Sequence, residues 1–378
     1  MRSRVTLLIL LTLLGGSVST GLAGISDAAG VFESGTECQD SDLFSFIPRA
    51  EVVNSSDHDG QLADPSPLLL LNGSIRLYIF GGPNGGVMSW WSGDEGGKWQ
   101  AEGARISPSD FQDLPKPNRH QRPIRLTNDS VRLIVGTGEG FISFLSDDDG
   151  WSFTSEEGFR LSNASGEMEQ MAKLSPIQLK NGSWRSYYGN SATHGGFTPA
   201  SIRSTWSPDS YNHTLETGIL LGNGSAQGGS TREPYPLSRG NDCVTIFHTL
   251  DATIPTEIAY STAADGRTFN QTHELGLNGS GSAVLVLPDQ RMMFFHDTGP
   301  DTETGNQVWW GWLTFGNGSG DGSGTVGDND TDGGGNSASV DGDGEEDGGQ
   351  KRFVVIALIV IALVVISTVV VIIKRRLG

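Results

Sequence analysis

The sequence is poor in basic residues. Its 25 Lys and Arg stand against 44 Asp and Glu, which gives a net charge of −19 over 378 residues. The basic residues that cluster flank an apolar segment near the C-terminus, so no basic face remains for phosphate groups. This balance argues against a nucleic-acid partner and favours a surface protein that its acidity keeps soluble.

Several motifs of catalysis and metal binding are absent as well. The sequence contains no G-x-S-x-G, H-E-x-x-H or P-loop signature. Its histidines are scattered without the spacing of metal ligands, so we expect no metal site and no cofactor. The part of the chain between the two apolar ends lacks a long helical periodicity, which favours an all-β fold.

Cysteine is limited to Cys38 and Cys243. Both lie outside the apolar segments, and an oxidising compartment permits one bridge between them. Two free thiols are the alternative that the sequence leaves open.

The N-terminus has the features of a secretory signal. Arg2 and Arg4 form a basic region, the apolar run Leu7–Leu14 follows, and small residues near Thr20–Gly24 provide a cleavage site. The apolar run is too short to cross a membrane. Residues 1–24 are therefore interpreted as a signal peptide rather than as a first membrane helix.

The C-terminus predicts a membrane anchor. Phe353–Ile373 carries no charge and is long enough, at about 20 residues, to cross the hydrocarbon core. The denser basic cluster lies in the tail 374–378, which the positive-inside rule places in the cytoplasm. We therefore expect a single-pass type I protein at the cell surface, with an extracellular domain over 25–315 and a membrane helix over 351–373.

The segments outside the membrane differ in composition. Residues 316–350 are mostly Gly, Asp, Ser and Asn, cannot bury a core, and are expected to form a disordered acidic stalk. The extracellular domain is rich in N-x-S/T sequons, which together with the signal predict N-glycosylation. Its acceptors are Asn54, Asn72, Asn128, Asn163, Asn181, Asn212, Asn223, Asn270 and Asn278.

A segment recurs along the extracellular domain. It has the pattern P-x-x-L-x-N-G, then an apolar strand, a second strand and a polar turn that ends in Trp or Phe. The copies start about 50 to 60 residues apart, which is typical of the blades of a β-propeller. They start at Pro67, Pro123, Pro176, Pro236 and Val284.

Five copies predict a five-bladed β-propeller, with a six-bladed ring as the alternative. In the first copy we expect strands over Leu68–Leu71, Ile75–Phe80 and Val87–Trp91. The fifth copy ends one strand short, and Leu43–Val53 before the first copy is a spare strand that can complete it. Closing the ring in this way removes exposed sheet edges.

A second repeat follows the third strand of each copy. Ser92–Trp99 and Ser146–Phe153 both fit S-x-D-x-G-x-x-aromatic, and weaker forms occur at Ser207–Ser210 and Thr262–Phe269. The pattern resembles the Asp box of sialidase-like propellers. Its Asp is expected to cap a tight turn and its aromatic residue to fill the space between blades, so these aspartates are interpreted as structural.

Residues 43–315 thus resemble two groups of propellers: the five-bladed glycosidases, which include arabinanases, β-xylosidases and invertase-like enzymes, and the sialidase-like proteins. Strand topology places the residues that lie three positions before each repeat on one face, around the channel. These residues are Asp64, His120, Lys173, Glu233 and Gly281.

The resemblance implies roles for two of these carboxylates. Asp64-Pro65-Ser66 resembles the opening that carries the general base in five-bladed glycosidases, and Glu233 lies near the position of their general acid. Such a pair suits glycoside hydrolysis, in which one carboxyl group protonates the leaving oxygen while the other activates water or attacks directly. The expected substrate contacts are His120, Arg122, Lys173, Arg232, Tyr235 and His194.

The chain also departs from both families. The third acidic residue of the glycosidases aligns with Lys173, although Glu167 or Glu169 could replace it from the same loop. The arginine-first opening of a sialidase is absent. Two functions therefore stay open: a membrane-anchored glycoside hydrolase, and a non-catalytic propeller that binds a carbohydrate or glycoprotein ligand for adhesion or recognition.

Overall fold

The computed structural model describes residues 38, 43–54, 62–81, 85–115, 117–162, 170–191, 200–222, 230–240, 242–250, 256–298 and 306–316. The predicted signal peptide, membrane segment and tail lie outside these residues, as does the predicted stalk after Gly316. Within the described part, no helix has the length and apolar character that crossing a bilayer requires.

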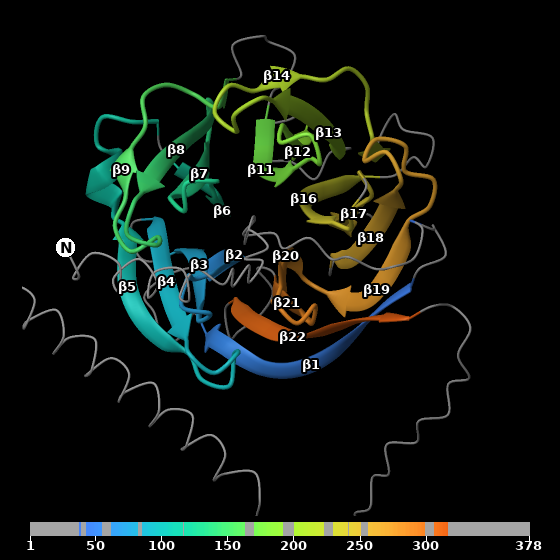
Figure 1. Cartoon of the computed structure of the whole chain (residues 1–378), viewed down its shortest axis with the longest axis horizontal. Helices are drawn as coiled ribbons and strands as arrows, with labels where there is room; N and C mark the ends of the chain where they lie inside the picture. The colour runs from blue at the N-terminus through green and yellow to red at the C-terminus, as the bar shows by residue number, and fades with distance from the viewer. Residues whose placement is uncertain are drawn as a thin grey trace, which may run out of the picture. The chain divides into compact units, whose positions relative to one another are not determined.

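Five antiparallel sheets surround a central axis (Figure 1). The strands of blade 1 are β2 (Leu62–Leu69), β3 (Ile75–Gly81), β4 (Gly86–Ser92) and β5 (Gln100–Ile106). A 3-10 helix, η2 (Pro108–Phe111), leads to blade 2, which contains β6 (Pro117–Arg125), β7 (Val131–Thr137), β8 (Gly140–Ser146), β9 (Thr154–Ser155) and β10 (Leu161–Ser162). The fold is thus the predicted five-bladed propeller, and the six-bladed alternative is set aside.

The other three blades repeat this order from the axis outward. Blade 3 contains β11 (Gln170–Gln178), β12 (Trp184–Ser191), β13 (Ala200–Ser207), β14 (Thr214–Leu215) and β15 (Leu221–Gly222). Blade 4 contains β16 (Thr231–Ser238), β17 (Val244–Leu250), β18 (Glu257–Ala263) and β19 (His273–Asn278). Blade 5 contains β20 (Ser280–Val286), β21 (Met292–Asp297), β22 (Gln307–Gly316) and β1 (Leu43–Asn54).

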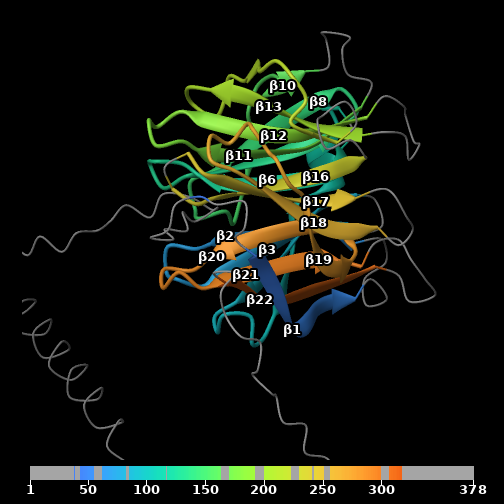
Figure 2. The ribbon, with the colours of Figure 1, turned by 90° about the vertical axis from the view of Figure 1, so that its right-hand side faces the viewer.

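The N-terminal strand completes the ring. β1 pairs antiparallel with β22 from Leu43 opposite Gly316 to Asn54 opposite Gln307, and it forms the outer edge of blade 5 (Figure 2). The innermost strands contact one another in the order β2, β6, β11, β16, β20 and back to β2. This closure by a spare strand is the one predicted from the sequence.

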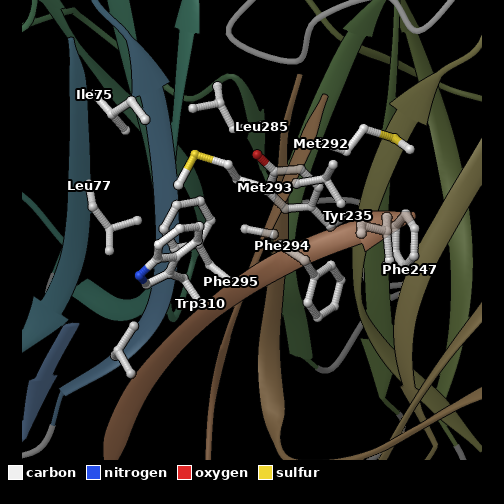
Figure 3. Close-up of a cluster of buried hydrophobic side chains, with 14 of the residues drawn as sticks. Ile75, Leu77, Tyr235, Phe247, Leu285, Met292, Met293, Phe294, Phe295 and Trp310 are labelled. Atoms are coloured by element: carbon white, nitrogen blue, oxygen red, sulfur yellow. The ribbon is translucent and has the colours of Figure 1, made fainter. Parts of the chain in front are cut away.

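The inner strands are buried because they lie between neighbouring blades. β2, β7 and β21 are buried along their whole length, so both faces of each sheet pack against other blades. The largest apolar cluster joins blades 4, 5 and 1, and Figure 3 shows Phe247, Phe294 and Trp310 within it. Apolar burial of this kind is the main stabilising contribution to such a ring.

Each hairpin between the first two strands has the same turn. In blade 1, Leu70 N donates to Ser74 O at 2.8 Å, and Gly73 takes the left-handed φ of +85° that the turn requires. Asp129, Gly182, Asp242 and Gln290 take a positive φ at the equivalent positions. The repeat P-x-x-L-x-N-G therefore encodes the end of an inner strand and its turn.

The second repeat forms a hydrogen-bonded turn on the same face. Asp94 Oδ1 accepts a hydrogen bond from Lys98 N at 2.8 Å, and Asp148 Oδ1 accepts one from Ser152 N at 2.9 Å. The backbone carbonyl of Gly150 accepts a hydrogen bond from Tyr78 Oη of blade 1 at 2.8 Å. These turns thus join neighbouring blades, and their aspartates bond to their own backbone.

Buried arginines also join the blades. Arg76, on the middle strand of blade 1, pairs with Glu102 of its own blade at 2.7 Å, and its Nη1 donates to Asp149 O of blade 2 at 2.7 Å. Blades 2 and 3 repeat this arrangement: Arg132 pairs with Glu156 and donates to Asp209 O, and Arg185 pairs with Glu216 and donates to Asp265 O.

A disulfide bond fixes the start of the closing strand. Cys38, just before β1, is bonded to Cys243 in the hairpin turn of blade 4. The free-thiol alternative is thereby set aside. The bond and the contact of Phe44 N with Tyr260 Oη, at 3.1 Å, both tie the N-terminal strand to blade 4.

The first strand of blade 1 differs from the prediction at both ends, since β2 ends at Leu69 rather than at Leu71. β2 begins at Leu62, six residues before the predicted Leu68, because the strand continues through a bulge at Asp64 and Pro65. The Asp-Pro pair has the composition of a turn, which conceals this part of the strand in the sequence.

Candidate functional site

The same β-bulge interrupts the innermost strand of every blade. The pairing register shifts between Ala63 and Ser66 in blade 1 and at the matching place in the other four blades. A bulge leaves one residue unpaired and re-aims its side chain. The bulged residues are Asp64, His120, Lys173, Glu233 and Gly281, which are the five positions aligned in the sequence.

All five bulged residues have a left-handed backbone. Their φ angles are +57°, +65°, +53°, +57° and +59° in chain order. A non-glycine residue in this region costs about 1–2 kcal/mol, and such strain tends to gather at functional sites. Four strained residues arranged around one axis therefore identify this end of the ring as the candidate site.

Carboxylates of the site bind the backbone of the next bulge. Asp64 Oδ2 accepts a hydrogen bond from His120 N at 3.3 Å, and Glu233 Oε2 accepts one from Gly281 N at 2.8 Å. Asp64 is 2% exposed, whereas Glu233 is half-buried. These two contacts join blade 1 to blade 2 and blade 4 to blade 5, with Glu233 more open to solvent than Asp64.

The fifth bulge lacks a side chain, and Asp297 takes its place. Asp297 lies at the end of β21, and its Oδ2 accepts a hydrogen bond from Asp64 N at 3.0 Å. Its Oδ1 accepts one from Ser280 Oγ at 2.5 Å. Burial, and then the negative charges of Asp64 and Glu233, raise the pKa of Asp297 to about 6.

Basic groups surround Asp64. His120 Nδ1 lies 3.1 Å from its Oδ2, and Lys173 Nζ lies 3.9 Å from its Oδ1. The buried Lys173 also donates to Ser282 O at 3.1 Å. Two basic side chains, from blades 2 and 3, thus approach the two oxygens of one carboxyl group in blade 1.

Two of the predicted substrate contacts lie beneath this cluster. Arg122 and Tyr235 are both fully buried, and the Arg122 guanidinium carbon is 3.6 Å from the centre of the Tyr235 ring. Lys173 Nζ lies 5.7 Å from the same ring. The negative face of the ring attracts both cations, so Arg122, Lys173 and Tyr235 form one buried group.

The arrangement has the groups for proton transfer. Asp64, His120 and Glu233 each offer an oxygen or nitrogen atom within 4.8 Å of the other two. The same atoms could hold a cation, although Lys173 already brings a positive charge to Asp64. The expectation that the chain binds no metal stays a prediction.

The structure brings Asp64, Glu233, His120 and Lys173 together, as the alignment of the repeats predicts. Arg232 is half-buried beside Glu233 in the same bulge. His194, Glu167 and Glu169 lie outside the described residues. The roles of all these residues in binding or catalysis stay predictions.

Sequence reasoning missed Asp297. A signal was available, because the end of the second strand of a blade faces the same side as the start of the first. In blade 5 the second strand ends in an aspartate, Asp297, and the bulge of the first strand holds a glycine, Gly281. An aspartate opposite a glycine indicates that the carboxyl group fills the place of the missing side chain.

Most of the described sequon acceptors lie on the surface. Asn54 is half-buried, and the other described acceptors are exposed: Asn72, Asn128, Asn181, Asn212, Asn270 and Asn278. Asn163 and Asn223 lie outside the described residues. Their modification stays a prediction.

No protein-family model and no curated protein sequence matches the chain. Solved structures do share its fold. A family 117 glycoside hydrolase from Zobellia galactanivorans is 14% identical with a TM-score of 0.52, over 73% of this chain and 92% of that one. An endo-arabinase from Bacteroides thetaiotaomicron is 15% identical with a TM-score of 0.51, over 71% of this chain and 96% of that one.

A third similar structure is an α-L-arabinofuranosidase from Clostridium thermocellum. It is 14% identical with a TM-score of 0.50, over 62% of this chain and 81% of that one. These three structures are glycoside hydrolases that share the propeller fold of this chain. They give no support to the sialidase-like part of the resemblance. At this level of identity the likeness shows the fold alone, since one fold hosts many functions.

Proposed function

We propose that this chain is a glycan-acting propeller and that it hydrolyses glycosidic bonds at the cluster of Asp64, His120 and Glu233. The observation that carries the proposal is the approach of the Asp64 and Glu233 carboxylates to within 4.8 Å at one end of the ring. The likeness to propeller glycoside hydrolases supports it at the level of the fold.

The short separation favours one of the two hydrolytic routes. Inverting enzymes hold their carboxyl groups about 6.5–9.5 Å apart to admit a water molecule, whereas retaining enzymes hold them about 5–5.5 Å apart. In the retaining route Glu233 protonates the leaving oxygen while Asp64 bonds to the anomeric carbon. Glu233 then removes a proton from water, which attacks that carbon and releases the sugar from Asp64.

The test is sugar release by the full-length chain from furanosides, pyranosides and sialosides. Glu233→Gln is expected to lower turnover by about 10²–10⁴-fold, which is the usual contribution of a general acid or base. Asp64→Asn removes the nucleophile and is expected to lower turnover by at least as much. The matched control is Asp289→Asn, an exposed carboxylate in the hairpin turn on the opposite face. Absence of turnover in folded wild-type protein, on every substrate, would refute the hydrolase.

A non-catalytic glycan-binding propeller is the second candidate. Every carboxylate of the cluster already accepts a hydrogen bond from a neighbouring blade, and Asp64 also lies near a buried ammonium group. These contacts are the ones a purely structural ring would need. Retention of labelled oligosaccharides without their cleavage would favour this candidate.

The proposed location is the cell surface, with residues 25–315 outside and the helix 351–373 in the membrane. The composition of the two ends supports this proposal. Full-length protein is expected to stay with membranes after an alkaline wash, and a chain ending at Gln350 to appear in the medium. Recovery of the full chain in the soluble fraction would contradict the anchor.

A further inference from the structure

A hollow lies between blades 1 and 2, on the face opposite the candidate site. It is formed by the hairpin turn between β2 and β3, the strands β4 and β5, and the polar turn after β8. Its volume of about 490 Å³ is within the range of ligand pockets. Residues that line it include Asn72, Trp91, Gln100, Glu102, Asp148 and Trp151.

Two exposed apolar side chains stand beside this hollow. Leu71 is 51% and Trp151 is 50% exposed, which makes them the most exposed large apolar residues of the described chain. Leu71 N donates to Asp149 Oδ2 at 3.0 Å, so the turns that carry the two side chains are joined. An indole left half open by a folded domain often marks a binding surface.

Two arginines contact the Trp151 ring, which stays half exposed. The Arg105 guanidinium carbon is 3.9 Å from the ring centre, and that of Arg76 is 5.3 Å away. Arg105 Nη1 also donates to Trp151 O at 3.2 Å. Because Arg76 is fixed by its buried pair with Glu102, the ring is a preformed surface that loses little entropy on binding.

Asn72 is the acceptor of an N-glycosylation sequon and belongs to the wall of this hollow. Its Oδ1 accepts hydrogen bonds from Ser74 N at 3.0 Å and from Ser74 Oγ at 2.6 Å. N-linked sugars are attached to the other terminal atom, Nδ2. Attachment therefore leaves both hydrogen bonds of the turn intact.

We propose that the hollow holds the N-glycan of Asn72 and that a sugar near the linkage stacks on Trp151. The apolar C–H face of a pyranose matches the indole surface, and the amide of Gln100 and the carboxylates of Glu102 and Asp148 offer partners for its hydroxyl groups. The glycan thus covers Leu71 and Trp151. The inference rests on the proposed secretion of the chain and is independent of hydrolysis.

The propeller contains its own reference site. Asn181 sits in the equivalent turn of blade 3, and its Oδ1 accepts hydrogen bonds from Ser183 N at 3.0 Å and Ser183 Oγ at 2.6 Å. The polar turn next to Asn72 belongs to blade 2 and carries Trp151. The polar turn next to Asn181 belongs to blade 4, and it carries Arg267 at the equivalent position. The two sequons therefore share a turn and differ in the aromatic platform.

The test measures the accessibility of both glycans in the full-length chain, produced in a eukaryotic secretory host and kept folded. A peptide N-glycosidase is added, and the loss of glycan at each asparagine is followed by peptide mass spectrometry. Stacking on an aromatic ring is expected to slow release at Asn72 by about three- to tenfold relative to Asn181. Trp151→Ala is expected to equalise the two rates, and Trp151→Phe to keep most of the difference.

A reciprocal measurement guards against a variant that misfolds. Hydroxyl-radical labelling of Trp151 is expected to rise at least about threefold when Asn72→Gln removes the glycan, while labelling of Trp206 stays constant. Equal rates at Asn72 and Asn181, an Asn72 without glycan, or unchanged labelling of Trp151 would each overturn the proposal. Absence of glycan at every sequon would in addition contradict secretion. None of these outcomes bears on the proposed hydrolysis, which the sugar-release assay tests.

Discussion

Asp297 occupies the space that a side chain on Gly281 would need, since a Cβ on Gly281 would lie 2.2 Å from Asp297 Oδ2. That oxygen accepts the hydrogen bond of Asp64 N, so the carboxylate from β21 performs for blade 5 what Asp64 and Glu233 perform for blades 1 and 4. This contact between blades 5 and 1 therefore depends on a pair of residues, a glycine and an aspartate.

Gly281→Ala is expected to destabilise the protein by about 3 kcal/mol. The left-handed φ of +59° accounts for about 1–2 kcal/mol, and displacement of the buried Asp297 carboxylate adds the loss of its hydrogen bonds. Gly73→Ala is the control, because Gly73 has a φ of +85° and no atom within 4 Å of its Cβ. Denaturant unfolding of both variants measures the difference, and equal losses would contradict the role of Asp297.

Asp297 also predicts how stability depends on pH. Its pKa is about 6 in the folded protein, against an ordinary value of 3.8, so the folded state binds the proton more tightly between these values. The contribution of Asp297 to stability is therefore greatest below about pH 4 and falls as the pH rises to 6, by at most about 3 kcal/mol.

Asp297→Asn is expected to remove this part of the pH dependence. The amide stays neutral, and Ser280 can turn its hydroxyl group to keep a hydrogen bond. The free energy of unfolding, measured from pH 4 to pH 7, should fall less steeply in the variant than in the wild type. The same slope in both proteins would show that Asp297 does not titrate in this range, and Asp289→Asn serves as the exposed control.

The blades could be predicted from the sequence because their signals are local. The Asn-Gly and Asp-x-Gly turns need particular backbone angles, so the same residues recur wherever the same turn recurs. Counting positions back from those turns also aligned Asp64 and Glu233, since equal strand lengths place equivalent residues at the same height in each blade.

The chemistry of the site could not be predicted in the same way. The contact of Asp297 with Asp64 joins residues 233 positions apart, and it depends on the closure of the ring. The burial of Arg122 against Tyr235 likewise joins the innermost strands of blades 2 and 4, which are not neighbours in the ring. No pattern within one repeat predicts contacts of this kind, because a repeat contains only the residues of its own blade.

The arginines between blades predict a contrast between buried and exposed ion pairs. Arg76→Met is expected to cost about 3 kcal/mol, because it leaves the buried Glu102 without its cation. The double variant Arg76→Met with Glu102→Leu should regain part of this loss, since neither charge is then buried. Arg291→Met removes exposed pairs with Asp289 and Glu95 and should leave the unfolding midpoint unchanged.

Unfolding midpoints of these three variants test the contrast. A loss in Arg76→Met no larger than that in Arg291→Met would show that the buried pairs do not hold the blades together. A double variant less stable than Arg76→Met would instead show that Glu102 has a favourable role of its own, through its hydrogen bond from Ser89 Oγ at 2.7 Å.

The disulfide predicts that closure of the ring is sensitive to reduction. Cys38 and Cys243 are 205 positions apart, and a bond that closes so long a loop stabilises the folded state by up to about 5 kcal/mol through the unfolded chain. It also holds the strand β1, whose pairing with β22 completes blade 5. Cys38→Ser, Cys243→Ser and their double variant should therefore be destabilised equally, and added reductant should lower the stability of the wild type to the same level.

Unfolding by denaturant, with and without reductant, measures the stability of the wild type and of the three variants. If the double variant is much less stable than either single one, the two cysteines act independently, and the disulfide is not what holds β1 in place.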